Sequence, residues 1–174
     1  MLDALQRTAF DYFMKQTRAH NGLVADTSRP GSPVSIAVVG LGLSAYPVAV
    51  ERGWMARNVA VQRSLTTLRF FAASDQSGAP ASTGYRGFYF HFLEAEGGLR
   101  TWQSELSSID TALLIIGMLT VAAYFSGAGP AETELRRLAQ AMYDRVDWHW
   151  AEHADAVALG WKPECGFLNY GWDG

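Results

Sequence analysis

Two carboxylates stand five residues apart, at Glu105 and Asp110. Glu105 follows an aromatic segment that ends at Trp102, and Asp110 falls in the first turn of an apolar stretch that runs to Phe125. Paired carboxylates can carry out acid–base chemistry, in which one group gives a proton and the other takes one. The pair therefore predicts acid–base chemistry on a polar substrate.

Asp110 also has a simpler interpretation. Ser107 and Asp110 have the spacing of a capping box, with Ser107 as the N-cap and Asp110 at the third helical position. A carboxylate there is stabilised as an anion by the helix dipole and the free N–H groups. The sequence thus predicts either a helix cap alone, or a cap that also serves as a general base or as an acceptor for a sugar hydroxyl.

Glu105 lies between Trp102 and Leu106 in the chain. Burial against these two side chains would raise the pKa of the carboxyl, which is the environment that a proton donor needs. The alternative is a solvated side chain at the mouth of a helix. Both interpretations stay open at this point.

Aromatic residues flank these carboxylates and a second polar segment near residue 162. A sugar site combines aromatic faces for ring C–H groups with charged groups for the hydroxyls. We expect Tyr and Trp, which have polar tips, to reach such a cleft, and Phe88, Phe90 and Phe92 to lie in the core. The cleft candidates are Tyr89, Trp102, Trp161, Tyr170 and Trp172, with Arg100 and Lys162 beside them.

Other site chemistries find little support in the sequence. His149 and His153 have the i, i+4 spacing of metal ligands, but no evident Cys or carboxylate completes a zinc site, so a solvated helix end is expected. The sequence has neither a P-loop nor a G-x-S-x-G motif, and Cys165 is a lone thiol without an evident activating base. We therefore expect no metal and no cofactor.

The length and composition of the chain are those of one domain with its own core. The chain has 174 residues, a net charge of −3 and no Lys/Arg run, so nothing indicates a nucleic-acid partner. Its two apolar runs, 36–50 and 111–125, are shorter than the roughly 18–20 residues that a membrane span needs. The first residues lack the features of a secretory signal, and the compartment stays open.

Hydrophobic periodicity predicts a mainly α fold with antiparallel neighbouring helices. An aromatic hairpin is expected over 88–101, turning at Gly97 and Gly98, and a second hairpin-like excursion in the aromatic tail after residue 147. The predicted helices cover 2–17, 35–46 with a kink or restart at Pro47, 56–73, 107–126, and a segment that begins at Pro130.

Three segments carry the pattern of a known family. They are SIAVVGLGLSAYPVAVERGW (35–54), GFYFHFLEAEGGLRTWQSELSSIDTALLIIGML (87–119) and GWKPECGFLNYGWDG (160–174). The chain resembles the glucoamylase-like family, which includes endo-β-1,2-glucanases and similar domains of cyclic β-1,2-glucan synthases. The resemblance implies an (α/α)6 toroid with a central active site and glycoside hydrolysis by carboxylates. Family members are commonly periplasmic or secreted.

The resemblance also implies roles for single residues. Glu105 and Asp110 would be catalytic, and a wider set would bind a glucan or oligosaccharide. Cys165 departs mildly from the pattern, which has Ser at that position. The expected substrate-binding residues are Tyr89, Arg100, Trp102, Trp161, Lys162, Glu164, Trp172 and Asp173.

Length is the main departure from the family. A complete toroid has twelve helices, and relatives continue after the Trp-Asp-Gly of 172–174 with a Tyr-Asn-Glu segment whose Glu is a catalytic candidate. Residues 1–174 are therefore expected to form the N-terminal part of one such domain, inactive alone, with exposed apolar helix faces that drive self-association.

Two functions of different classes stay open. The first is a glycoside hydrolase-like domain that acts on a glucan, expected to be β-1,2-linked. The alternative is a non-catalytic carbohydrate-binding or helical interaction module, which would use the same aromatic residues without a proton donor. Carboxylates that face the same concavity as Trp102 and Trp172 would favour the enzyme. A merely capping Asp110 and a solvated Glu105 would favour the module.

Overall fold

The computed structural model describes residues 1–153 and 155–172, and about half of them are helical. The mainly α prediction is confirmed, and the expected helix bounds agree with the observed ones to within a few residues, except that α2 continues through Pro47. The helices are α1 (Leu2–Gln16), α2 (Ile36–Glu51), α3 (Arg57–Ala73), α4 (Ser108–Tyr124), α5 (Pro130–Arg145) and the single turn α6 (Trp148–Ala151).

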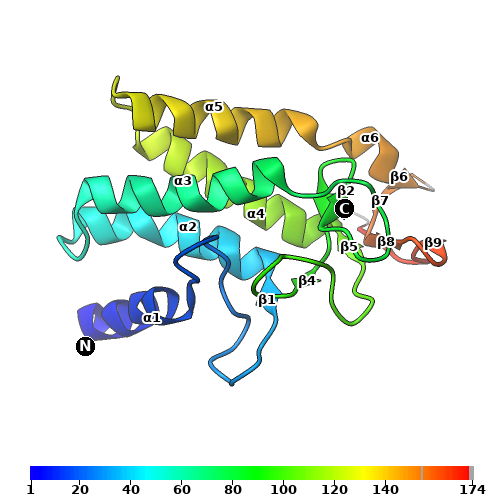
Figure 1. The fold of residues 1–174 in the computed structure, drawn as a ribbon, viewed down its shortest axis with the longest axis horizontal. Helices are drawn as coiled ribbons and strands as arrows, with labels where there is room; N and C mark the ends of the chain where they lie inside the picture. The colour runs from blue at the N-terminus through cyan, green and yellow to red at the C-terminus, as the bar shows by residue number, and fades with distance from the viewer. Residues whose placement is uncertain (154, 173–174) are drawn as a thin grey trace.

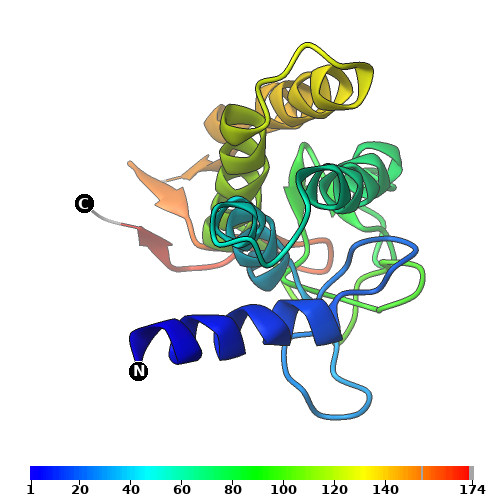
Figure 2. The same cartoon turned by 90° about the vertical axis from the view of Figure 1, so that its left-hand side faces the viewer.

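The four helices α2, α3, α4 and α5 form two pairs (Figures 1 and 2). Helices α2 and α4 lie side by side and run in one direction, whereas α3 and α5 run back in the other direction. The short links 52–56 and 125–129 therefore join antiparallel helices, as such links predict. The arrangement brings the N-terminal ends of α2 and α4 to the same end of the molecule.

Two glycines allow α2 and α4 to approach closely. A Cβ atom on Gly40 would lie 2.7 Å from the Cα of Leu114, and one on Gly117 would lie 2.6 Å from the Cα of Gly40. Neither position has room for a methyl group, so backbone meets backbone at the crossing.

Short antiparallel strand pairs gather at the end where α2 and α4 begin (Figure 1). The expected hairpin over 88–101 is present only in its part 92–101, where Leu93 of β4 pairs with Arg100, whereas residues 88–89 pair with β2 instead. The tail contributes hairpins as predicted. The pairs are β1 (Val34–Ser35) with β4 (Phe92–Leu93), β2 (Gly84–Tyr85) with β3 (Phe88–Tyr89), β5 (Leu106–Ser107) with β8 (Gly160–Lys162), β8 with β9 (Gly166–Phe167), and β7 (Ala156–Ala158) with both β6 (Glu152–His153) and β10 (Gly171–Trp172).

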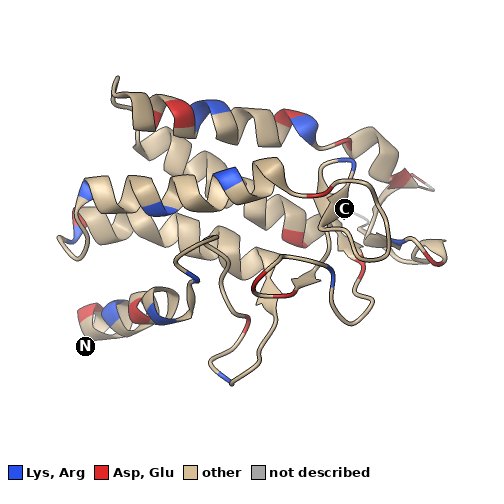
Figure 3. Ribbon diagram, viewed as in Figure 1, with Lys and Arg blue, Asp and Glu red and all other residues tan. Residues whose placement is uncertain are grey.

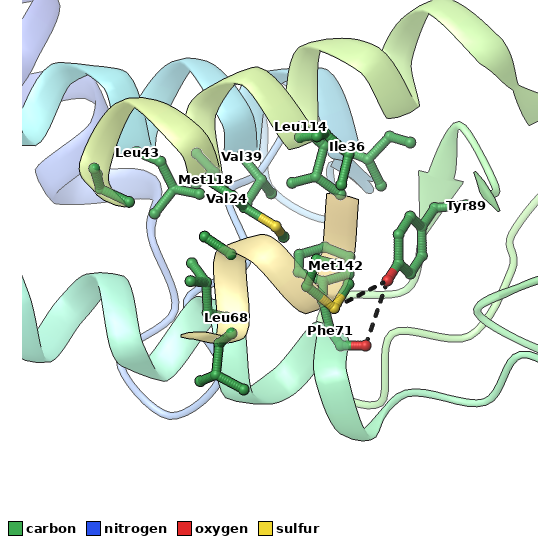
Figure 4. Close-up of a cluster of buried hydrophobic side chains, with 14 of the residues drawn as sticks. Val24, Ile36, Val39, Leu43, Leu68, Phe71, Tyr89, Leu114, Met118 and Met142 are labelled. Atoms are coloured by element: carbon green, nitrogen blue, oxygen red, sulfur yellow. Dashed lines mark hydrogen bonds between the residues drawn. The ribbon is translucent and has the colours of Figure 1, made fainter. Parts of the chain in front are cut away.

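The core lies between the four long helices (Figure 4). Side chains from α2, α3, α4 and α5 meet there, among them Val39, Leu68, Met118 and Met142. Phe88 and Phe90 are buried as expected, whereas Phe92 is only half-buried. The core thus holds the start of α4, and with it Asp110, in a fixed position.

Charge is distributed unevenly over the helices (Figure 3). Lys, Arg, Asp and Glu occur along α1, α3 and α5, whereas α2 carries only Glu51 and α4 only Asp110. None of the helices in the described part of the chain has the length and apolarity that a membrane span requires. Large apolar side chains nevertheless stand exposed on the uncharged pair, namely Leu41, Val48, Ile109 and Ile116.

We therefore predict that the chain self-associates through α2 and α4, because exposed apolar side chains without charged neighbours favour association. Sedimentation velocity should show concentration-dependent dimers or larger species. Ile116→Glu, at a side chain that is 57% exposed, should shift the chain toward monomer. Tyr143→Glu, on α5 and 48% exposed, is the matched control and should not. A monomer at every concentration would contradict the prediction.

Candidate functional site

The two predicted carboxylates converge on one side chain, His91. Its Nδ1 lies 3.0 Å from Oε1 of Glu105, and its Nε2 lies 3.5 Å from Oδ2 of Asp110. The Glu105 and Asp110 side chains are only 22% and 14% exposed, so neither faces bulk water. We call His91, Glu105 and Asp110 the His91 cluster.

Three hydrogen bonds from backbone N–H groups fix the positions of the cluster residues. The His91 N–H donates to the carbonyl of Glu105 (2.9 Å), and the Ile36 N–H at the start of α2 donates to the carbonyl of His91 (3.3 Å). The Asp110 N–H donates to Oγ of Ser107 (3.2 Å), so the predicted cap is confirmed. Ser107 therefore caps α4, while the Asp110 carboxylate in the first turn faces His91.

Electrostatics reverse one expectation for Glu105. Its pKa lies below its ordinary value, chiefly because His91 hydrogen-bonds to the carboxylate, and this outweighs the effect of burial. Of the two interpretations left open by the sequence, the proton donor with a raised pKa is not supported: burial acts in that direction, but the His91 partner, which the sequence did not reveal, outweighs it. Glu105 is held as an anion, which suits a proton acceptor or hydroxyl acceptor and not a donor.

His91 shows the complementary shift. Its pKa is raised, first by the hydrogen bond to Glu105, with the charges of Asp110 and Asp26 adding to the effect and burial opposing it. Neither His91 nor Asp26 was a candidate from the sequence. The available signal was a lone histidine within an aromatic strand, fourteen residues before a glutamate.

Trp102 stands exposed beside the cluster. The His91 ring stacks on Phe92 with 3.9 Å between centroids, and Trp102 meets the edge of Phe92 at 5.4 Å. Trp102 is 71% exposed, and both it and Gln103 adopt left-handed backbone conformations, with φ of 55° and 54°. Such φ values are unfavourable for residues other than glycine, so the surrounding contacts must hold this turn.

Arg100 and Glu164, both expected to bind substrate, bind each other, and Glu164 stays 40% exposed. The Arg100 Nη atoms lie 2.6 and 3.0 Å from the two Glu164 oxygens, and Nε donates to the carbonyl of Ser104 (2.6 Å). The Arg100 side chain is 1% exposed and lies over the Phe90 ring. Its burial does not fit a direct sugar contact. Arg100 therefore holds the turn that carries Trp102 in place.

Tyr89 also departs from expectation, because it lies in the core (Figure 4). Its side chain is fully buried, its ring packs edge-on against Phe71 at 4.9 Å, and its hydroxyl bonds to the Phe71 carbonyl (3.4 Å) and to Arg145. Burial raises the pKa of Tyr89 to about 12. The polar tip is satisfied inside the protein, so the structure does not support substrate binding by Tyr89.

Residues of the segment 160–172 contact both β2 and the start of α4. Trp161 stacks on Tyr85 with 5.4 Å between centroids, and Trp172 donates from Nε1 to Oγ of Ser108 (3.0 Å), the first residue of α4. Lys162 contributes to lowering the pKa of Glu105. Trp172 is 49% exposed.

Asp173 and the pair His149 and His153 are also among the residues singled out in the sequence. Asp173 lies outside the described residues. His149 and His153 belong to different elements, α6 and β6, and His149 is 95% exposed, as expected for a solvated end.

Comparison with known proteins gave no matching family model. The chain is 25% identical over 169 residues to the exo β-1,2-glucooligosaccharide sophorohydrolase (non-reducing end) of Parabacteroides distasonis, which covers 92% of this chain and 22% of that protein. The chain thus spans about a fifth of its curated relative.

Two solved structures share the fold. A "putative glucoamylase" from Bacteroides uniformis matches with a TM-score of 0.82 and 22% identity, over 94% of this chain and 40% of that one. An endo-β-1,2-glucanase from Chitinophaga pinensis, in complex with sophorotriose and glucose, matches with a TM-score of 0.79 and 21% identity, over 98% of this chain and 41% of that one. The resemblance predicted from the sequence is therefore confirmed: the chain is similar to the glucoamylase-like proteins that include β-1,2-glucanases.

Proposed function

We propose that the chain is part of a glycoside hydrolase domain that acts on a β-1,2-linked glucan. The observation that carries the proposal is the convergence of Glu105 and Asp110 on His91 beside the exposed Trp102. Two enclosed carboxylates next to an aromatic face are what hydroxyls and sugar rings require. The β-1,2 linkage rests on the names of the relatives.

We infer further that the helices belong to an (α/α)6 toroid. The parallel pair α2 and α4 would form part of the inner wall, and the returning helices α3 and α5 part of the outer wall. The alternating directions and the close α2–α4 crossing support this arrangement. Further helices would complete the ring and the opposite side of the sugar cleft.

The roles follow from the charge states. Ionised Glu105 would accept a hydrogen bond or proton from a sugar hydroxyl or a water molecule, with Asp110 as its neighbour. Trp102 would offer a face for ring C–H groups. Because Glu105 is held as an anion, we place the proton donor of the reaction outside this pair, and we expect the chain alone to be inactive.

Calorimetric titration with sophorotriose tests this function. We expect weak binding that Trp102→Ala weakens by about fivefold, since an aromatic platform contributes roughly 1 kcal/mol. Tyr143→Ala, at another exposed aromatic side chain on α5, is the matched control and should leave binding unchanged. Prolonged incubation with β-1,2-glucan should release no sugar. Binding that ignores Trp102→Ala would overturn the proposed site, whereas hydrolysis by the chain would contradict only the expectation that it is inactive alone.

A non-catalytic carbohydrate-binding module is the second candidate. It is favoured by the ionised state of Glu105, which does not suit a proton donor. A cationic iminosugar separates the two candidates, because it imitates the charge of the glycosidic transition state. A hydrolase site should bind 1-deoxynojirimycin more tightly than glucose and lose this preference in Glu105→Gln. A binding module should show no preference.

A further inference from the structure

His91 is faced by carboxylates from three parts of the chain. Glu105 precedes β5, Asp110 lies in the first turn of α4, and Asp26 lies in the loop before β1. Lys162 from β8 adds a positive charge that acts on Glu105. The His91 side chain is 30% exposed, so water screens these interactions only in part.

Both ring nitrogens of His91 face an oxygen. A neutral imidazole carries a single N–H, so one of its nitrogens would point a lone pair at a carboxylate. An imidazolium donates from both nitrogens, to Glu105 at 3.0 Å and toward Asp110 at 3.5 Å. The ring cannot easily turn away from this arrangement, because it stacks on Phe92 with an interplanar angle of 14°.

We propose that His91 is a positioning residue, an imidazolium that holds Glu105 and Asp110 toward one point as a pair of anions. The role of this carboxylate pair in catalysis rests on the proposed function. The charge of His91 does not, because it depends only on side chains of this chain. His91 thereby sets the protonation of Glu105, and the pair is organised only while the imidazolium is charged.

The pH range follows from the direction of the two shifts. His91 has a raised pKa, so its contribution to stability is complete below 6.5, its ordinary value, and is lost as the pH rises through the raised pKa. Glu105 has a lowered pKa, so its contribution is complete above 4.5 and is lost as the pH falls through the lowered pKa. The cluster is therefore strongest between these two values.

NMR of the isotope-labelled 174-residue chain tests the proposal. At pH 6.5, ¹H–¹⁵N spectra of the histidine side chains should show both His91 nitrogens protonated. His91→Phe keeps the ring stack on Phe92 but has no N–H, and it should raise the pKa of Glu105, read from its ¹³C carboxyl shift. A purely structural ring would leave the Glu105 titration unchanged in His91→Phe, which would overturn the proposal.

Two further variants keep the result decisive if His91→Phe fails to fold. Glu105→Gln should lower the midpoint of the His91 titration, and His91→Gln should abolish the fall in melting temperature as the pH rises above 6.5. His149→Gln, at an exposed histidine, is the matched control and should keep this fall. A neutral His91 at pH 6.5, or a titration that ignores Glu105→Gln, would contradict the proposal. None of these readouts uses sugar, so failure to bind sophorotriose would count only against the proposed function.

Discussion

Gly40→Ala is expected to destabilise the protein strongly, although alanine is the better helix former. The added Cβ would lie 2.7 Å from the Cα of Leu114, which is backbone and cannot move aside without separating α2 from α4. Helix propensity would gain roughly 1 kcal/mol, but overpacking of this kind costs about 3 kcal/mol or more. Urea unfolding followed by circular dichroism should show a net loss of about 2 kcal/mol or more, a large share of the roughly 5–15 kcal/mol of a typical domain.

Gly42→Ala is the matched control, because it lies in the same helix. Its Cβ would meet only side-chain atoms, the nearest being Cδ1 of Phe13 at 3.1 Å, and a side chain can adjust. The change should stay within about 1 kcal/mol. Gly117→Ala, on the other side of the crossing, should resemble Gly40→Ala. Equal effects of Gly40→Ala and Gly42→Ala would show that the α2–α4 crossing is not as close as described.

Arg100→Ala is the second substitution with a large expected effect. It removes a side chain that is 1% exposed and leaves the carbonyl of Ser104 without its donor. The cavity and the lost hydrogen bonds together should cost about 2–4 kcal/mol in the free energy of unfolding. The Trp102 turn should also loosen, because Arg100 connects Ser104 to the β8–β9 hairpin.

Chemical denaturation and the indole N–H signal of Trp102 in ¹H–¹⁵N spectra give the two readouts. Arg100→Lys should fall between alanine and the natural residue, because a lysine cannot reproduce the two-pronged contact with Glu164. Arg52→Ala is the control, since Arg52 also pairs with a carboxylate, Asp3, but both side chains are exposed. It should change stability by less than about 1 kcal/mol. A similarly small effect of Arg100→Ala would contradict the support role.

Local patterns predicted the helices well because each depends on residues close in sequence. The apolar period of α3 and α5, the Pro130 start and the Ser107 cap are all decided within a few positions. The hairpin turn at Arg86 and Gly87 was not foreseen. Both residues have positive φ there, and the arginine hides the usual two-residue turn pattern.

The site was predicted less completely because its partners come from distant segments. Glu105 and Asp110 were found by their spacing, but the charge of Glu105 depends on His91, which its own neighbours do not reveal. Arg100 and Tyr89 resemble ligand-binding residues in sequence, yet Glu164, Phe71 and Arg145 satisfy them inside the fold. Residue type alone could not separate these polar groups from those that remain available to a sugar.

The central claim is that the His91 cluster and Trp102 form one side of a β-1,2-glucan site. It is tested most directly by adding sophorotriose to the ¹⁵N-labelled chain, with the β-1,4-linked isomer cellotriose as the control. We predict shift changes centred on the Trp102 indole N–H and on the amides of Phe92, Glu105 and Asp110, and clearly smaller changes with cellotriose. Shift changes confined to other parts of the chain, or equal responses to both sugars, would contradict the claim.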